Sequence, residues 1–228
     1  MGTMCSTNGD YNTNERRHLF EKFSQRSGGL TVRIFEGKLK DSRTTVIVND
    51  ANPKLTNQGQ LSFDLMNAAG LNVQRECNQY ISQNQALGVS EVAITDSGAL
   101  GCSKIFHTVG PQWMGGDRKE EAKIEEAVIA CLEAATKISA KSIAFPPLIR
   151  EPYNIPLFYV SRSMLNAILN YSRRSSTSKS SLKEIHLIAS SSTVSKLLVH
   201  DASEIFGLNV SENYSTSTSE TIIGPKAQ

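Results

Sequence analysis

The sequence predicts a single α/β domain in which helices cover both faces of a central sheet. Segments with strand-like patterns alternate along the chain with segments whose apolar residues recur at helical spacing, as in folds that place a sheet between helix layers. Hydrophobic residues make up 39% of the 228 positions, which is enough for one large core. Neither a disulfide framework nor a membrane span is expected, because the four cysteines are far apart and no run of about 18 apolar residues occurs.

The expected elements follow one another from residue 30 onward. Residues 44–48 form a β-branched run typical of a buried strand, and residues 117–138 repeat apolar side chains along one helical face. The remaining strands are predicted at 30–35, 91–95, 104–109, 141–145 and 184–189, and the remaining helices at 62–69, 72–83 and 157–169.

Both ends of the chain differ in composition from the middle. They are rich in polar residues and show no sustained apolar period, so we expect a flexible N-terminal segment (1–29), a folded domain (30–208) and a disordered C-terminal tail (209–228). A short helix around 16–23 is an alternative for part of the first segment. The serine-rich, basic stretch 172–181 is expected to be an exposed loop.

The charge balance excludes two classes of protein. A formal net charge of +2 with 20% charged residues fits neither a strongly basic nucleic-acid wrapper nor an acidic disordered chain, so nucleic acid is not an expected partner. No cluster of His and Cys has metal-ligand spacing, so no metal and no cofactor is expected. The polar N-terminus lacks the apolar core of a secretion signal, and we expect an intracellular location, cytoplasmic or nuclear.

Sheets of this class bind ligands at the carboxyl ends of their strands, so a ligand site is expected in the loops that follow the strands. After the strand at 44–48 the chain reads Asn-Asp-Ala-Asn-Pro-Lys-Leu-Thr-Asn-Gln-Gly-Gln-Leu, from Asn49 to Leu61. A second run, at 105–113, contains His-Thr-Val-Gly-Pro. Together these runs resemble the signature of macro domains, which bind ADP-ribose, with the closest likeness to those of the large poly-ADP-ribose-polymerase-type proteins.

The resemblance covers residues 30–208 and implies a macro-domain-like three-layer α/β/α sandwich with a central mixed sheet. It also implies ADP-ribose or an ADP-ribosylated protein as the partner, with further protein partners as an open alternative. The residues that it places at the ligand are Lys38, Asn49, Ala51, Asn52, Gln58, Gly59, Gln60, Leu61, Arg150, Glu151 and Tyr153.

This sequence departs from the family pattern at both phosphate-binding loops and at the adenine end. Two glycines of the first loop are replaced by Gln58 and Gln60, and a glycine of the second is replaced by Glu151, whose carboxylate would repel a diphosphate. Arg150 can oppose this repulsion by contacting phosphate, and Tyr153 keeps the family's aromatic position. Lys38 stands where the family has an aspartate that accepts from the adenine amino group, and lysine has no acceptor. We therefore expect a weakened pocket.

Two other functions stay open: a scaffold that binds no ligand, and a site for a different nucleotide or anion. Hydrolysis of ADP-ribose esters is not expected, because Ser62 occupies the position of the family's aspartate and Asp64 should point elsewhere on the helix. His107 is expected to be a hydrogen-bonded core residue rather than an acid or base. Asn49 and Asn52 either contact the ligand or close the turn through side-chain hydrogen bonds.

Overall fold

The computed structural model describes residues 19–148, 155–175 and 180–207. Its strands are β1 (Phe20–Ser27), β2 (Leu30–Glu36), β3 (Val46–Asp50), β4 (Val92–Asp96), β5 (Lys104–Thr108), β6 (Ser142–Phe145) and β7 (Glu184–Ala189). Its helices are α1 (Gln60–Ala69), α2 (Leu71–Asn84), α3 (Glu120–Lys137), α4 (Leu157–Ser175) and α5 (Ser192–Ile205), with a 3-10 turn, η1 (Leu39–Asp41).

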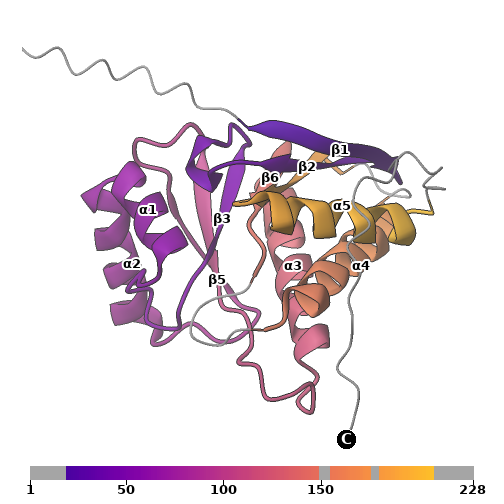
Figure 1. Ribbon diagram of the computed structural model, residues 1–228. Helices are drawn as coiled ribbons and strands as arrows, with labels where there is room; N and C mark the ends of the chain where they lie inside the picture. Colours follow the sequence, from indigo (N-terminus) through magenta and orange to yellow (C-terminus); the bar gives the residue numbers. More distant parts are fainter. Residues whose placement is uncertain (1–18, 149–154, 176–179, 208–228) are drawn as a thin grey trace, which may run out of the picture.

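The strands form one mixed sheet in the order β1-β2-β7-β6-β3-β5-β4 (Figure 1). The five strands from β2 to β5 in this order are parallel, and the two edge strands, β1 and β4, run antiparallel to their neighbours. The carboxyl ends of β2, β7, β6 and β3 therefore lie along the same edge of the sheet. The predicted central mixed sheet is confirmed.

Alternating side chains attach a helix layer to each face of the sheet. On β3, Val46 and Val48 join the core under α3, α4 and α5, whereas Ile47 joins the core under α1 and α2. All three side chains are completely buried. Figure 1 shows α1 and α2 on one side of the sheet and α3, α4 and α5 on the other. The predicted three-layer sandwich is confirmed.

The main correction concerns the start of the domain. Residues 20–27, predicted to belong to a flexible segment or a short helix, form β1 and pair with β2 through a turn at Gly28 and Gly29. The prediction was wrong here because the strand carries little apolar alternation: it sits at the edge, mostly exposed, and β2 supplies its backbone partners. Residues 1–18 and 209–228, which carry the other predictions about the ends, lie outside the described residues.

Two further differences lie in the C-terminal half. Helix α4 continues to Ser175, so the start of the stretch predicted as an exposed loop is helical. Ser172 is buried there, and its hydroxyl lies 2.8 Å from that of Ser27 on β1. Helix α5 was not predicted at all. Within the described residues no helix is both long and apolar enough to cross a bilayer.

The turn between β1 and β2 generates a stability prediction. A Cβ at Gly28 would lie 2.1 Å from the backbone oxygen of Ser172, whereas a Cβ at Gly29 would meet nothing within 4 Å, although both glycines have positive φ. We expect Gly28→Ala to lower the free energy of unfolding by about 2–4 kcal/mol and Gly29→Ala by only about 1 kcal/mol, measured by urea denaturation. Equal losses would mean that β1 does not pack against α4 as described.

Candidate functional site

A cavity of about 330 Å³ opens at the edge of the sheet where β2, β7, β6 and β3 end. Each of these strands contributes wall residues at or just after its carboxyl end: Gly37 follows β2, Asp50 ends β3, Pro147 follows β6, and Ser190 follows β7. The site therefore lies where a parallel sheet leaves a crevice, as the sequence predicted from the strand order of this fold class.

The N-terminus of α1 forms one wall of this cavity. Gly59 is the N-cap, and Gln60, Leu61 and Ser62 make up the first helical turn. The first N–H groups of a helix have no acceptor inside it and carry a partial positive charge, so this wall favours an anion. No acidic residue occupies the first turn of α1 to offset that charge.

A glycine is needed at position 59 because of its backbone conformation, and not because a side chain would clash with neighbouring atoms. Its φ of 120° lies in a region that residues with a side chain rarely adopt, yet a Cβ there would meet nothing within 4 Å. Gln58 and Gln60, which replace glycines of the family pattern, also line the cavity.

Charged side chains of both signs complete the wall. Lys38 and Lys40 flank Leu39 at the turn after β2, and Asp50 and Asp64 lie on the side of β3 and α1. The expectation that Asp64 points elsewhere was wrong: it lines the cavity, and Gln60 Nε2 donates a 2.8 Å hydrogen bond to its Oδ1. Residues 61, 62, 64 and 65 all reach the cavity because its wall covers more than one stripe of the helix.

Asn49 lies behind the cavity at the centre of a polar network. Its side chain is fully buried, and its Nδ2 donates to Asn57 Oδ1 at 2.9 Å and to His107 Nδ1 at 3.1 Å. The hydroxyl of Ser62 donates to Asn49 Oδ1 at 2.9 Å and to the Asp50 carbonyl at 3.0 Å. One amide thus joins β3, β5, α1 and the loop between β3 and α1.

His107 is neutral in this network. Complete burial lowers the pKa of His107 from 6.5 to about 4. Its Nδ1 accepts from Asn49, so Nε2 carries the proton, and this nitrogen lies 3.0 Å from the hydroxyl of Thr95 on β4. The prediction of a hydrogen-bonded core histidine is confirmed.

The loop before α1 is closed by two other asparagines. Asn52 Oδ1 accepts from the backbone N–H groups of Lys54 and Thr56 at 3.0 and 3.2 Å, and its Nδ2 donates to the Thr56 hydroxyl at 2.7 Å. Asn57, which the sequence did not single out, has a φ of 52° and donates to Leu55 O and Gln74 Oε1. Asparagine tolerates this left-handed conformation better than other residues with side chains.

The structure brings together six of the eleven predicted ligand residues. Lys38, Gln58, Gly59, Gln60 and Leu61 line the cavity directly. Asn49 supports it from behind through Ser62.

Of the other five, Ala51 and Asn52 are described and do not line the cavity. Ala51 is fully buried, and its N–H donates to Thr108 O at 2.8 Å. Asn52 closes its own turn, as the second of its two predicted roles requires. Arg150, Glu151 and Tyr153 lie outside the described residues.

Sequence reasoning missed the contributions of β7 and α5. Ile188, Ser190 and Val194 line the cavity. The first two could have been found by applying the carboxyl-end rule to the strand predicted at 184–189. Val194 could not be found in this way, because α5 was not predicted.

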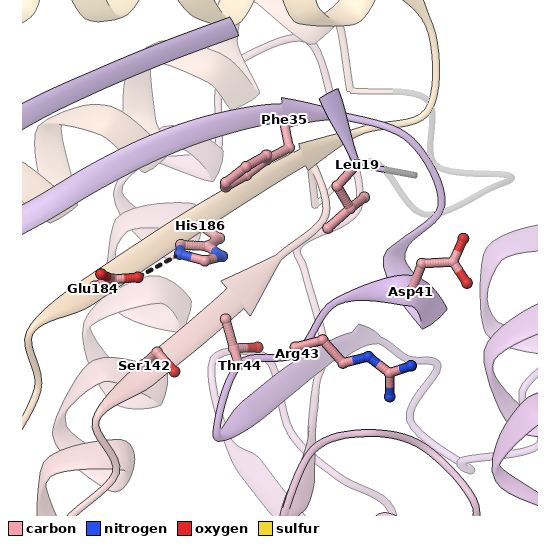
Figure 2. Close-up of a pocket in the computed structure, with 8 residues that line it drawn as sticks. All are labelled: Leu19, Phe35, Asp41, Arg43, Thr44, Ser142, Glu184 and His186. Atoms are coloured by element: carbon pink, nitrogen blue, oxygen red, sulfur yellow. Dashed lines mark hydrogen bonds and ion pairs between the residues drawn. The ribbon is translucent and has the colours of Figure 1, made fainter. Parts of the chain in front are cut away.

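A second hollow of about 350 Å³ lies on the face of the sheet below Leu19 and Phe35 (Figure 2). Its wall includes a 2.9 Å hydrogen bond between His186 Nε2 and Glu184 Oε2, and the His186 ring, whose pKa is lowered by burial, lies 4.8 Å from that of Phe35. Glu184 and Ser142 begin their strands, so the amino ends of β6 and β7 form part of the wall of this hollow. None of the predicted ligand residues that the structure describes lines this hollow, and the first cavity is the candidate site.

Comparisons with known proteins agree on one family. The family model described as "Macro domain" matches residues 48–164. The O-acetyl-ADP-ribose deacetylase of Enterobacter cloacae is 30% identical over 140 residues, which cover 61% of this chain and 78% of that protein.

Two solved structures share the fold. The Oceanobacillus iheyensis macrodomain with ADP superposes with a TM-score of 0.77 at 22% identity, covering 83% of this chain and 98% of that one. The Trypanosoma brucei macrodomain in complex with ADP-ribose gives 0.65 at 20% identity, covering 74% and 68%.

Removing the buried amide of Asn49 should destabilise the domain more than removing the half-buried amide of Asn52. Asn49→Ala leaves His107, Ser62 and Asn57 each short of a buried partner, so we expect the free energy of unfolding to fall by about 3–5 kcal/mol. Asn52→Ala, the matched control in the same loop, should cost about 1 kcal/mol. Chemical denaturation of both variants measures the difference, and a loss at Asn49 no larger than that at Asn52 would contradict the network's structural role.

The lowered pKa of His107 predicts a dependence of stability on pH. The unfolded chain binds a proton at this residue near pH 6.5 and the folded chain only near pH 4. The contribution of neutral His107 to the free energy of unfolding is therefore fully present above pH 6.5 and is lost as the pH falls from 6.5 toward 4. We expect this loss to reach about 3 kcal/mol and to disappear in His107→Gln, as judged by denaturation of both proteins at pH values across that range. Parallel pH profiles for the two proteins would contradict the assignment.

Proposed function

The chain belongs to the macro domain family, and we propose that its cavity binds ADP-ribose, either free or attached to a protein. The observation that carries this proposal is the position of the α1 N-terminus, which opens into the cavity at the carboxyl edge of the sheet. Its N–H groups suit a diphosphate, and the apolar side chains of Leu39, Ile188 and Val194 suit the flat faces of a base. ADP and ADP-ribose occupy the named macrodomains of similar fold, which supports the same ligand class here.

We propose further that the affinity is low for this ligand. Gln58 and Gln60 add side chains to the wall where glycine would leave the backbone accessible, and both face the cavity. Lys38 supplies donors where an acceptor would pair with the adenine amino group, and an unmatched donor costs about 1–3 kcal/mol. These substitutions make the pocket atypical while its framework stays intact.

The proposed activity is recognition and not hydrolysis. Ser62 is almost completely buried, and its hydroxyl already donates to Asn49 and to the Asp50 carbonyl, so it is poorly placed as a general base. Asp64 is the one exposed carboxylate among the described residues of the cavity wall, and Gln60 bonds to it. The deacetylase activity in the name of the Enterobacter cloacae relative is therefore not proposed for this chain.

Two predictions from the sequence remain proposals: the likeness to one group of macro domains and the cellular location. We propose that the chain is most similar to the macro domains of poly-ADP-ribose-polymerase-type proteins and that it works inside the cell. The free state of Cys77, Cys102 and Cys131 supports the second of these proposals, since unpaired thiols persist in a reducing compartment.

Titration calorimetry with ADP-ribose tests the proposed function. We expect heat of binding with a dissociation constant weaker than about 100 μM. A value near 1 μM would contradict the weakened pocket. Absence of binding would favour a scaffold without ligand.

A single charge change should locate the diphosphate. Gln60→Glu places a carboxylate at the N-terminus of α1 and should weaken ADP-ribose binding at least tenfold by repulsion. Gln79→Glu makes the same change on an exposed position of α2, outside the cavity wall, and should leave the affinity unchanged. Equal affinities of the two variants would place the diphosphate elsewhere.

A further inference from the structure

The cavity has two ends with different chemistry. The end formed by β3 and α1 contains the helix N-terminus, Asp50 and Asp64. The second end lies where the neighbouring strands β2 and β7 finish, and Leu39 of its turn packs against Leu65 and Met66, beyond the first turn of α1. Its described wall residues are Gly37, Lys38, Leu39, Lys40, Ile188, Ser190 and Val194. If the diphosphate lies at α1, the base of the same ligand lies against the apolar side chains of the second end.

The charged groups at this second end donate hydrogen bonds and accept none. Each lysine has three N–H donors and no acceptor. No ion pair or side-chain hydrogen bond joins Lys38 or Lys40 to another described residue, and the only bond of Lys38 among these residues that lies outside a helix or strand is the 3.0 Å one that its carbonyl accepts from Asp41 N–H. The nearest acids in sequence, Glu36 and Asp41, do not line the cavity. Glu36 pairs with Lys22 at 3.5 Å and accepts from the Ser195 hydroxyl at 3.0 Å, and Asp41 lines the second hollow.

The substituent at the 6-position of a purine is either a hydrogen-bond donor or a hydrogen-bond acceptor. Adenine presents a 6-amino donor, whereas guanine and hypoxanthine present a keto oxygen that accepts, next to an N7 that accepts in every purine. Lysine pairs with the keto edge and leaves the amino edge without a side-chain carboxylate as partner. The side chains at this end therefore match a 6-keto purine.

We propose that the turn after β2 makes this cavity selective for the diphosphate ribose of a 6-keto purine, inosine or guanosine, over that of adenosine. Lys38 is the selecting residue, because it is exposed at the turn directly after the strand and its extended backbone leads into η1. This preference rests on the proposed function, since it assumes a nucleoside diphosphate ribose with its phosphates at α1. The low affinity for ADP-ribose that is proposed above would follow from the same preference.

The test compares two probes, ADP-ribose and inosine-diphosphate ribose, which differ only in the base. We expect the whole chain to bind the inosine compound about tenfold more tightly in calorimetric titrations at one salt concentration. Lys38→Met, which keeps an apolar stem and removes the donors, should reduce this ratio toward one. Lys38→Asp, which supplies an acceptor, should reverse it in favour of ADP-ribose.

Lys54→Met is the control for net charge, because Lys54 is exposed in the loop before α1 and does not line the cavity. It should keep the tenfold ratio of the parent chain. Equal affinity of the parent chain for both probes would overturn the base preference and leave the proposed function standing. The same conclusion would follow if Lys38→Met and Lys54→Met changed the ratio of the two affinities to the same extent. Binding of neither probe would overturn the proposed function and the preference with it.

Discussion

The buried amide of Asn49 is the constraint on which the site depends. It sits at the end of a central strand and uses its donors and acceptor on His107, Asn57 and Ser62, which belong to β5, the loop before α1, and α1 itself. Because each buried polar group needs a partner, moving the loop or the first turn of α1 would break several hydrogen bonds at once. The N-terminus of α1 is thereby held at the edge of the sheet, where its first residues line the cavity.

The buried network around Asn49 fixes the position of α1, whereas the exposed residues of the cavity wall are less constrained by packing. The exposed side chains of Gln58, Gln60 and Lys38 line the cavity without entering the core, so their identities change the cavity wall more than the fold. Gly59 is different, because its backbone conformation has to be kept for α1 to begin where it does. A chain can therefore keep the macro-domain framework while the side chains that line its cavity differ.

Local sequence signals predicted most of the elements that build this framework. The β-branched run that ends at Val48 and the apolar face of α3 are strong signals, since a buried strand and an amphipathic helix each have their own periodicity. β1 has no such signal, and its order comes from pairing with β2 and from the contact between Ser27 and Ser172. α5 was missed although Ser191 caps it through Val194 N, because its polar first turn hides the buried positions that follow.

The sequence by itself determined the sandwich, its family likeness and the loop from Asn49 to Leu61 as part of the site. These features follow from the order of apolar and polar residues and from the residue types that a tight turn requires. Only the tertiary structure decided which side chains of that loop face a ligand. Asn49 and Asn52 read alike in the sequence, yet one lies in the interior network and the other closes its own turn. The roles of Asp64, Ile188 and Val194 were also set by packing, because residues far apart in the chain meet at the edge of the sheet only after the strands have paired.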